Sequence, residues 1–107
     1  MLYIIYQLDV DDRSVSGDIR KRVKPDHLKY LDQHEDILVL GGAMLADDGV
    51  ERVGSTLIIN VPNREAAEAF SRNEPFRSAG LFKSVTITRM RRGQWNPGAA
   101  PATPEGN

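Results

Sequence analysis

Cysteine is absent from this 107-residue chain, which excludes disulfide bonds, thiolate nucleophiles and cysteine-based zinc or iron–sulfur centres. Long hydrophobic runs are missing too, since no apolar stretch approaches the roughly 18 residues of a membrane-spanning helix. The first residues also lack the basic segment and cleavage site of a secretory signal. Finally, 14 basic and 15 acidic residues leave a net charge of −1, with no excess of positive charge for nucleic acid or an anionic membrane. We therefore expect a cytoplasmic protein that binds neither.

The composition predicts one globular domain followed by a short tail. Apolar residues make up 40% of the chain and charged residues 27%, as in ordinary globular proteins, and this length supports a single core. Residues 93–107 are rich in proline, glycine and alanine, and Trp95 is their one large apolar side chain. We expect residues 1–92 to form the domain and residues 93–107 to be a mobile tail that is dispensable for folding.

Segments rich in apolar and β-branched residues predict four strands, at residues 2–8, 37–40, 54–61 and 82–90. Polar segments at residues 11–18 and 43–53 are predicted to be loops.

A first helix is predicted to begin at Pro25, because proline presets the first helical turn and Asp26 suits the positive end of the helix. Asn63 is the expected N-cap of a second helix. One more helical turn is expected in residues 73–79, where Gly80 would end it.

The order strand, helix, strand, strand, helix, strand predicts an α+β, ferredoxin-like fold whose antiparallel sheet has the strand order 4-1-3-2. Both helices then cover one face of the sheet. The first strand is apolar on both faces, and the third places Ile58 opposite Leu57 and Ile59, so the uncovered face also needs burial. We expect a homodimer in which two copies pack sheet against sheet.

This topology brings several candidate site residues to one edge of the sheet. The expected set is Asp9, His27, the glycine pair 41–42, Ser55 and Glu74. His27 lies within the apolar arc of its helix, where a histidine either completes a buried hydrogen-bond network or serves a site. The basic run at residues 20–24 has two interpretations as well, a solvated helix face or attraction of an anionic substrate.

Neither a metal nor a nucleotide cofactor is expected. His27 and His34 are seven residues apart, about 10.5 Å along a helix, which is too far for one ion. Gly41-Gly42 does not match a dinucleotide-binding fingerprint, and Ser55 lacks the sequence context of a hydrolase nucleophile.

Five short stretches in order resemble the YciI-like family. They are Met-Leu-Tyr-Ile-Ile-Tyr running to Asp9, Val-Lys-Pro-Asp-His-Leu-Lys-Tyr-Leu, Leu-Gly-Gly, Gly-Ser-Thr and Asn-Glu-Pro-Phe-Arg-Ser-Ala-Gly-Leu. The resemblance spans residues 1–92 and implies a dimeric α/β barrel. It also implies a site built on a histidine–aspartate pair with a nearby serine.

Carried onto this chain, the histidine falls on His27 and the serine on Ser55. Asp9 matches an acidic position and is the first choice for the partner of His27. Glu74 is the second choice, because the family often has aspartate there. The family also often has arginine where Lys24 stands, and lysine lacks the planar fork that grips a carboxylate. Expected substrate contacts are Ser55, Gly42, Lys24 and Phe76.

Three functional hypotheses follow. The first is a cofactor-free enzyme of the lyase or dehalogenase type, in which His27 is the general acid or base on a small organic acid or cyclic compound. In this enzyme Ser55, or the backbone N–H groups near Gly42, would hold an oxygen that gains charge. The second is a non-catalytic homodimer that binds or senses a small ligand. The third is a structural domain in which His27 is a core residue.

Overall fold

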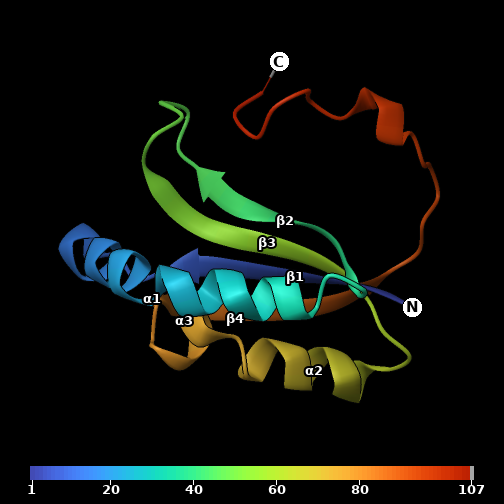
Figure 1. The fold of residues 1–107 in the computed structure, drawn as a ribbon, viewed down its shortest axis with the longest axis horizontal. Helices are drawn as coiled ribbons and strands as arrows, with labels where there is room; N and C mark the ends of the chain where they lie inside the picture. Colours follow the sequence, from blue (N-terminus) through green and yellow to red (C-terminus); the bar gives the residue numbers. More distant parts are fainter. Residues whose placement is uncertain (107) are drawn as a thin grey trace.

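The computed structural model describes residues 1–106 as an antiparallel sheet with helices packed on one face (Figure 1). The strands are β1 (Leu2–Asp9), β2 (Leu38–Leu45), β3 (Arg52–Asn60) and β4 (Phe82–Met90). The helices are α1 (Arg13–Gln33), α2 (Arg64–Arg72), α3 (Pro75–Ser78) and the 3₁₀ turn η1 (Pro97–Ala99). The sheet order β2-β3-β1-β4 is the predicted order read from the other edge, so the ferredoxin-like prediction is confirmed. Within residues 1–106, no helix is both long and apolar enough to cross a membrane.

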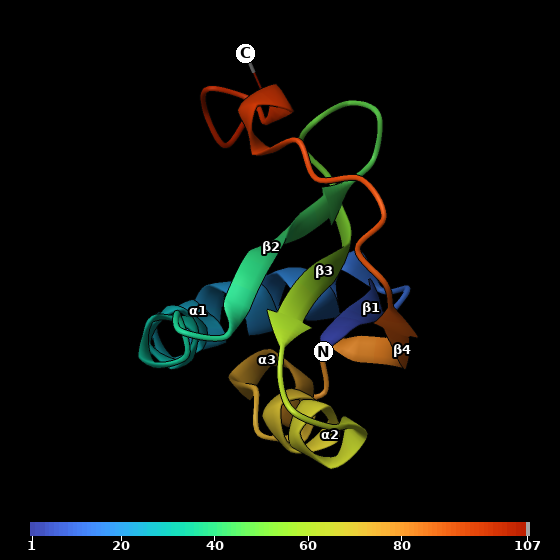
Figure 2. The same cartoon turned by 90° about the vertical axis from the view of Figure 1, so that its right-hand side faces the viewer.

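The core lies between the sheet and the helices. Figure 2 shows the same arrangement turned by 90°. Tyr3 and Ile5 of β1 pair with Ile59 and Leu57 of β3, and all four side chains are buried toward the helices. The next residues along each strand point to the other face, because side chains alternate in a strand.

Helix α1 begins much earlier than the sequence predicts, so the loop expected at residues 11–18 is wrong. Asp12 is the N-cap, and its side chain accepts hydrogen bonds from the backbone N–H groups of Ser14 and Val15. Bonds from the Ser14 hydroxyl and from these N–H groups hold the pKa of Asp12 below its usual value of 3.8. Pro25 lies inside the helix rather than at its start. Proline has no backbone N–H, so the carbonyl group four residues earlier in the helix receives no hydrogen bond from it. Pro25 is exposed, and water can bond this carbonyl instead.

Strand β2 is longer than predicted. It continues through the glycine pair to Leu45, with Gly42 opposite Thr56 and Ala43 opposite Ser55. The remaining turn is closed by the Asp48 side chain, which accepts from two backbone N–H groups, and by Gly49 at φ +73°. The glycines were interpreted as the end of the strand because glycine weakens strand pairing, but here they lie within it.

The other two predicted helices are confirmed. The Asn63 side chain accepts from the Ala66 N–H at 2.8 Å and caps α2, while α3 begins after Glu74 and is followed by Gly80 at φ +82°.

The C-terminal segment leaves β4 and arches over β2, where Pro104 adjoins the cleft between α1 and the β2–β3 ribbon (Figure 1). Trp95 is 55% exposed, and its ring lies 5.4 Å from the Arg92 guanidinium rather than in the core. We expect truncation after Gly93 to leave unfolding cooperative and to change the free energy of unfolding by less than about 0.5 kcal/mol, as for ordinary surface changes. Urea titration measures this change, and a loss of several times that size would show that Trp95 stabilises the domain.

Candidate active site

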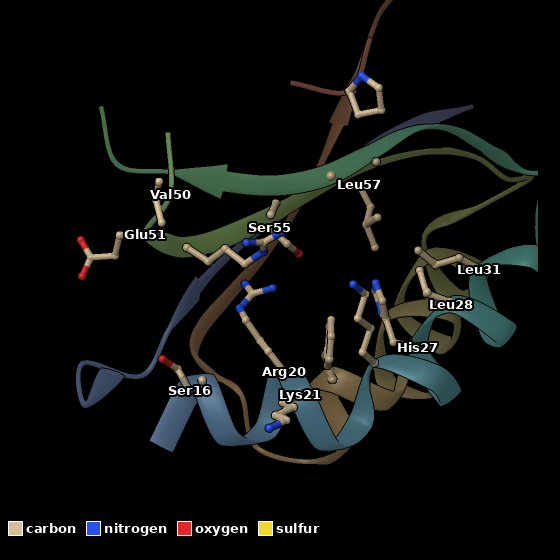
Figure 3. Close-up of a pocket in the computed structure, with 18 of the residues that line it drawn as sticks. Ser16, Arg20, Lys21, His27, Leu28, Leu31, Val50, Glu51, Ser55 and Leu57 are labelled. Carbon is tan, nitrogen blue, oxygen red and sulfur yellow. The ribbon is translucent and has the colours of Figure 1, made fainter. Parts of the chain in front are cut away.

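A cleft of about 900 Å³ lies between α1 and the β2–β3 ribbon (Figure 3). Arg20 and His27 project into it from α1, while Ser55 and Leu57 face them from β3. Leu28, Leu31 and Gly41 add apolar surface near His27. Gly42, Lys24 and Phe76, which the sequence predicted as substrate contacts, line the same cleft. The structure therefore gathers these residues as expected, and their contact with a substrate stays a prediction.

Glu74 is the carboxylate that pairs with His27. The imidazole Nδ1 lies within hydrogen-bond reach of Glu74 Oε1, and the side chains are 15% and 2% exposed. Because an ionised carboxylate only accepts, this bond assigns the proton to Nδ1 and leaves Nε2 as the basic nitrogen. No residue among 1–106 has a hydrogen bond to Nε2, and His27 lines the cleft. The pair is thus arranged for proton transfer at Nε2.

Glu74 is held in place by its position at the start of α3. Its second oxygen, Oε2, accepts from the Arg77 N–H at 3.2 Å, so the carboxylate also caps this helix. Tyr30 lies nearby and donates its hydroxyl to the Phe70 carbonyl at 2.8 Å. Burial, and secondarily the charge of Glu74, raise the pKa of Tyr30 above 10.0. Glu74 is therefore held by hydrogen bonds at both of its oxygens, and its charge is felt at Tyr30.

Phe76 fixes the plane of the imidazole. The two rings stack with centroids 3.9 Å apart and planes inclined by 20°. Phe76 follows Glu74 by two residues, so one short segment supplies both the hydrogen-bond partner and the stacking partner of His27.

Asp9, the first choice for this partner, binds Arg20 instead. Arg20 Nε and Nη2 donate to the two carboxylate oxygens at 2.9 Å each, and Nη2 also donates to the Gly54 carbonyl at 3.0 Å. The reason is the early start of α1, which places Arg20 rather than His27 over the end of β1. The expected His27–Asp9 pair is therefore absent, and the buried Asp9 serves to anchor Arg20.

Ser55 is bound by a residue that the sequence analysis missed. Gln7 Nε2 donates to Ser55 Oγ at 2.8 Å, and both residues are buried. The alternation of side chains along β1 could have revealed this contact. Gln7 and Asp9 continue the series of inward positions that begins with Tyr3 and Ile5. Polar residues at inward positions require partners, and here those partners line the cleft.

Positive charge predominates around the cleft. The charged lining residues are Arg13, Arg20, Lys21, Lys24, Arg52 and Glu51. Glu51 is bound to Arg13, whereas Lys24 and Arg52 have no carboxylate partner within residues 1–106. Of the basic run, only Arg22 makes an exposed ion pair along the helix, with Asp18 at 3.6 Å. The cleft therefore favours an anionic ligand. The described residues contain no cluster of three or more metal-ligating side chains.

Close backbone packing beside Ser55 gives a stability prediction. A Cβ added at Gly54 would lie 2.2 Å from the Gln7 carbonyl oxygen, whereas one at Gly42 would meet nothing within 4 Å. We expect Gly54→Ala to lower the free energy of unfolding by about 1–3 kcal/mol or more, as overpacking does. Gly42→Ala is the control, and equal stability of the two variants in urea would contradict the prediction.

The sheet topology and the cleft define a ferredoxin-like α+β domain with a histidine–carboxylate pair facing a cationic cleft. Residues 1–91 match the family described as the YCII-related domain, and the chain belongs to this family. It is 31% identical over 99 residues to Protein YciI of Escherichia coli O6:H1 and of Shigella flexneri, covering 86% of this chain and 98% of each relative. The family prediction is therefore confirmed.

One solved structure is similar to this protein in both fold and sequence. It is 5-chloro-2-hydroxyhydroquinone dehydrochlorinase (TftG) of Burkholderia phenoliruptrix AC1100, in complex with 2,5-dihydroxybenzoquinone. The TM-score is 0.76 and the identity 31%, with 87% of this chain and 96% of that chain covered. A dehalogenating enzyme that binds a small ring compound is thus similar to this protein throughout most of its length.

Proposed function

We propose that this protein is a cofactor-independent enzyme of the dehalogenase or lyase kind, with His27 as general acid or base on a small oxygenated ring compound. The observation that carries the proposal is the His27–Glu74 pair, with Nδ1 on the buried carboxylate and Nε2 at the cationic cleft. The similarity to TftG, a dehydrochlorinase, supports the same reaction class.

Loss of HCl from a chlorinated hydroxyaromatic compound requires three things from a protein. A proton must move from a ring hydroxyl to the carbon that carries chlorine, which gives the keto tautomer, and a second hydroxyl proton must be taken as the C–Cl electron pair leaves with chloride. Nε2 of His27 would transfer these protons while Glu74 stabilises the imidazolium. Donors must hold the ring oxygen that gains charge, a role for the Ser55 hydroxyl. Positive charge must favour the deprotonated substrate and the departing chloride. Lys24, which lines the cleft and lies on the same helix as His27, would supply part of this charge. The ring retains its electrons in this elimination apart from the pair that leaves with chloride, so no redox cofactor is needed.

The direct test is chloride release from 5-chloro-2-hydroxyhydroquinone under anaerobic conditions, which prevent oxidation of the compound by air. We expect release that depends on the protein and is lost in His27→Ala. Binding of the compound without chloride release would overturn dehydrochlorination of this compound and favour the non-catalytic ligand-binding alternative.

We also propose that the protein is a homodimer formed through the helix-free sheet face. Ile4 and Ile58 pair on that face, and Tyr6 and Leu40 are 45% and 65% exposed. Apolar side chains gathered on one face of a sheet favour a partner surface.

Ile58→Glu should therefore convert the dimer to a folded monomer, as measured by light scattering and circular dichroism. Leu57→Glu is the matched control, because Leu57 is buried toward the helices and its replacement should unfold the chain. A folded monomer for the unmodified protein would contradict the dimer.

A further inference from the structure

We infer that Arg20 and Ser55 form a subsite for a negatively charged oxygen carried by a single-ring substrate. This inference deepens the proposed function by naming the substrate class. It rests on the proposed function and on the hydrogen-bond donors of Arg20 and Ser55 that have no acceptor among residues 1–106.

The first component of the subsite is the guanidinium of Arg20. Its Nε and Nη2 donors are fully used on Asp9 and on the Gly54 carbonyl. The two N–H groups of Nη1 have no acceptor within residues 1–106, although the side chain is only 13% exposed and lines the cleft. Arginine remains charged at all ordinary pH values, so these donors are permanent.

The second component is the hydroxyl of Ser55, which faces Arg20 across the cleft (Figure 3). Its oxygen accepts from Gln7 Nε2 at 2.8 Å, so its own hydrogen is free to donate to another group. The subsite thus presents two N–H groups and one O–H group, all held by buried partners.

Phe76 contacts both Arg20 and His27. Its ring stacks on the imidazole at 3.9 Å and lies 5.5 Å from the Arg20 guanidinium carbon. The subsite and the imidazole therefore lie close to the same aromatic side chain and line the same cleft, within reach of one small ring compound. A charged oxygen held by Arg20 and Ser55 would leave the opposite side of this ring near Nε2.

The anchoring by Asp9 holds the donors of this site in place. A free arginine adapts to many ligands, whereas three hydrogen bonds fix this guanidinium before any ligand arrives. A neutral ligand of the same shape could still accept hydrogen bonds from Arg20, but it would lose the attraction between a negative charge of its own and the guanidinium.

Titration calorimetry with benzoate and its neutral analogue benzamide tests the inference without requiring turnover. We expect the unmodified protein to prefer benzoate, Ser55→Ala to weaken benzoate binding about tenfold, and the double variant Asp9→Asn/Arg20→Gln to lose the preference. The double replacement keeps a neutral hydrogen-bonded pair, and circular dichroism checks its fold. If the double variant does not fold, Ser55→Ala is the test, and unchanged benzoate binding by this variant would contradict the inference.

Two further variants separate this inference from its alternatives. Lys24→Met removes an exposed cation from the same cleft, and His27→Ala removes the proposed base. Both variants should still bind benzoate more tightly than benzamide, although Lys24→Met should bind benzoate less tightly than the unmodified protein because a cation of the cleft is lost. Loss of turnover in His27→Ala then leaves the subsite intact. Equal binding of the two ligands by the unmodified protein, or a preference lost in Lys24→Met but kept in Ser55→Ala, would overturn the inference. A parallel pair, 4-nitrophenolate and 4-nitroanisole, shows whether a phenolate oxygen serves as well as a carboxylate.

Discussion

Replacing His27 by alanine should lower kcat for chloride release by about 10²–10⁴-fold, the usual contribution of a positioned general base. The replacement removes the basic Nε2 but leaves Glu74 bonded to the Arg77 N–H, so the start of α3 remains capped. We expect the variant to stay folded, as circular dichroism and urea unfolding will show.

The matched control is His34→Ala in the same segment of chain. His34 Nδ1 is bonded to the Tyr30 carbonyl at 2.7 Å, and His34 does not line the cleft, so its loss should leave kcat unchanged. Glu74→Gln should give a kcat between those of the unmodified protein and His27→Ala, because glutamine keeps a hydrogen bond but not the charge that stabilises the imidazolium. A folded His27→Ala variant with undiminished kcat would exclude His27 as the base.

A large effect on stability is expected from Asp9→Ala, at about 3–5 kcal/mol of unfolding free energy. The Asp9 side chain is fully buried, and its removal leaves the Arg20 guanidinium, at 13% exposure, without its counter-charge. Urea denaturation measures the loss, together with thermal unfolding at the same pH.

Asp18→Ala provides the comparison, because Asp18 makes an exposed ion pair with Arg22 on the same helix. Exposed pairs of this kind contribute at most about 1 kcal/mol. If the two variants lose similar amounts of stability, the Asp9–Arg20 pair does not have the structural role that its geometry indicates.

The sequence predicted the strand order, and with it the edge of the sheet where the candidate residues gather, because the order of strands and helices along the chain allows few topologies. It did not predict the first half of α1. In this helix only Ser16 and Ile19 are buried, so the stretch lacks the apolar stripe by which helices are recognised. Its start depends on the Asp12 cap, a signal that is equally typical of a turn.

The partner of His27 could not be decided from the sequence for the same reason. Asp9 and Glu74 were both expected at one edge, and the choice depends on where α1 begins. A helix that starts at Arg13 brings Arg20 over Asp9 and leaves His27 for Glu74. The Gln7–Ser55 bond was also missed, although the inward position of Gln7 in β1 could have revealed it.

The buried and the exposed residues of the site differ in how freely evolution can alter them. Asp9, Glu74 and Ser55 are buried, and each is hydrogen-bonded to another side chain, so few substitutions there would preserve the fold. Lys24 and Arg52 are exposed and have no carboxylate partner among the described residues, so they can change at little cost in stability. Members of a lineage built on this chain would then diversify in the ligands they accept while inheriting one histidine–carboxylate pair.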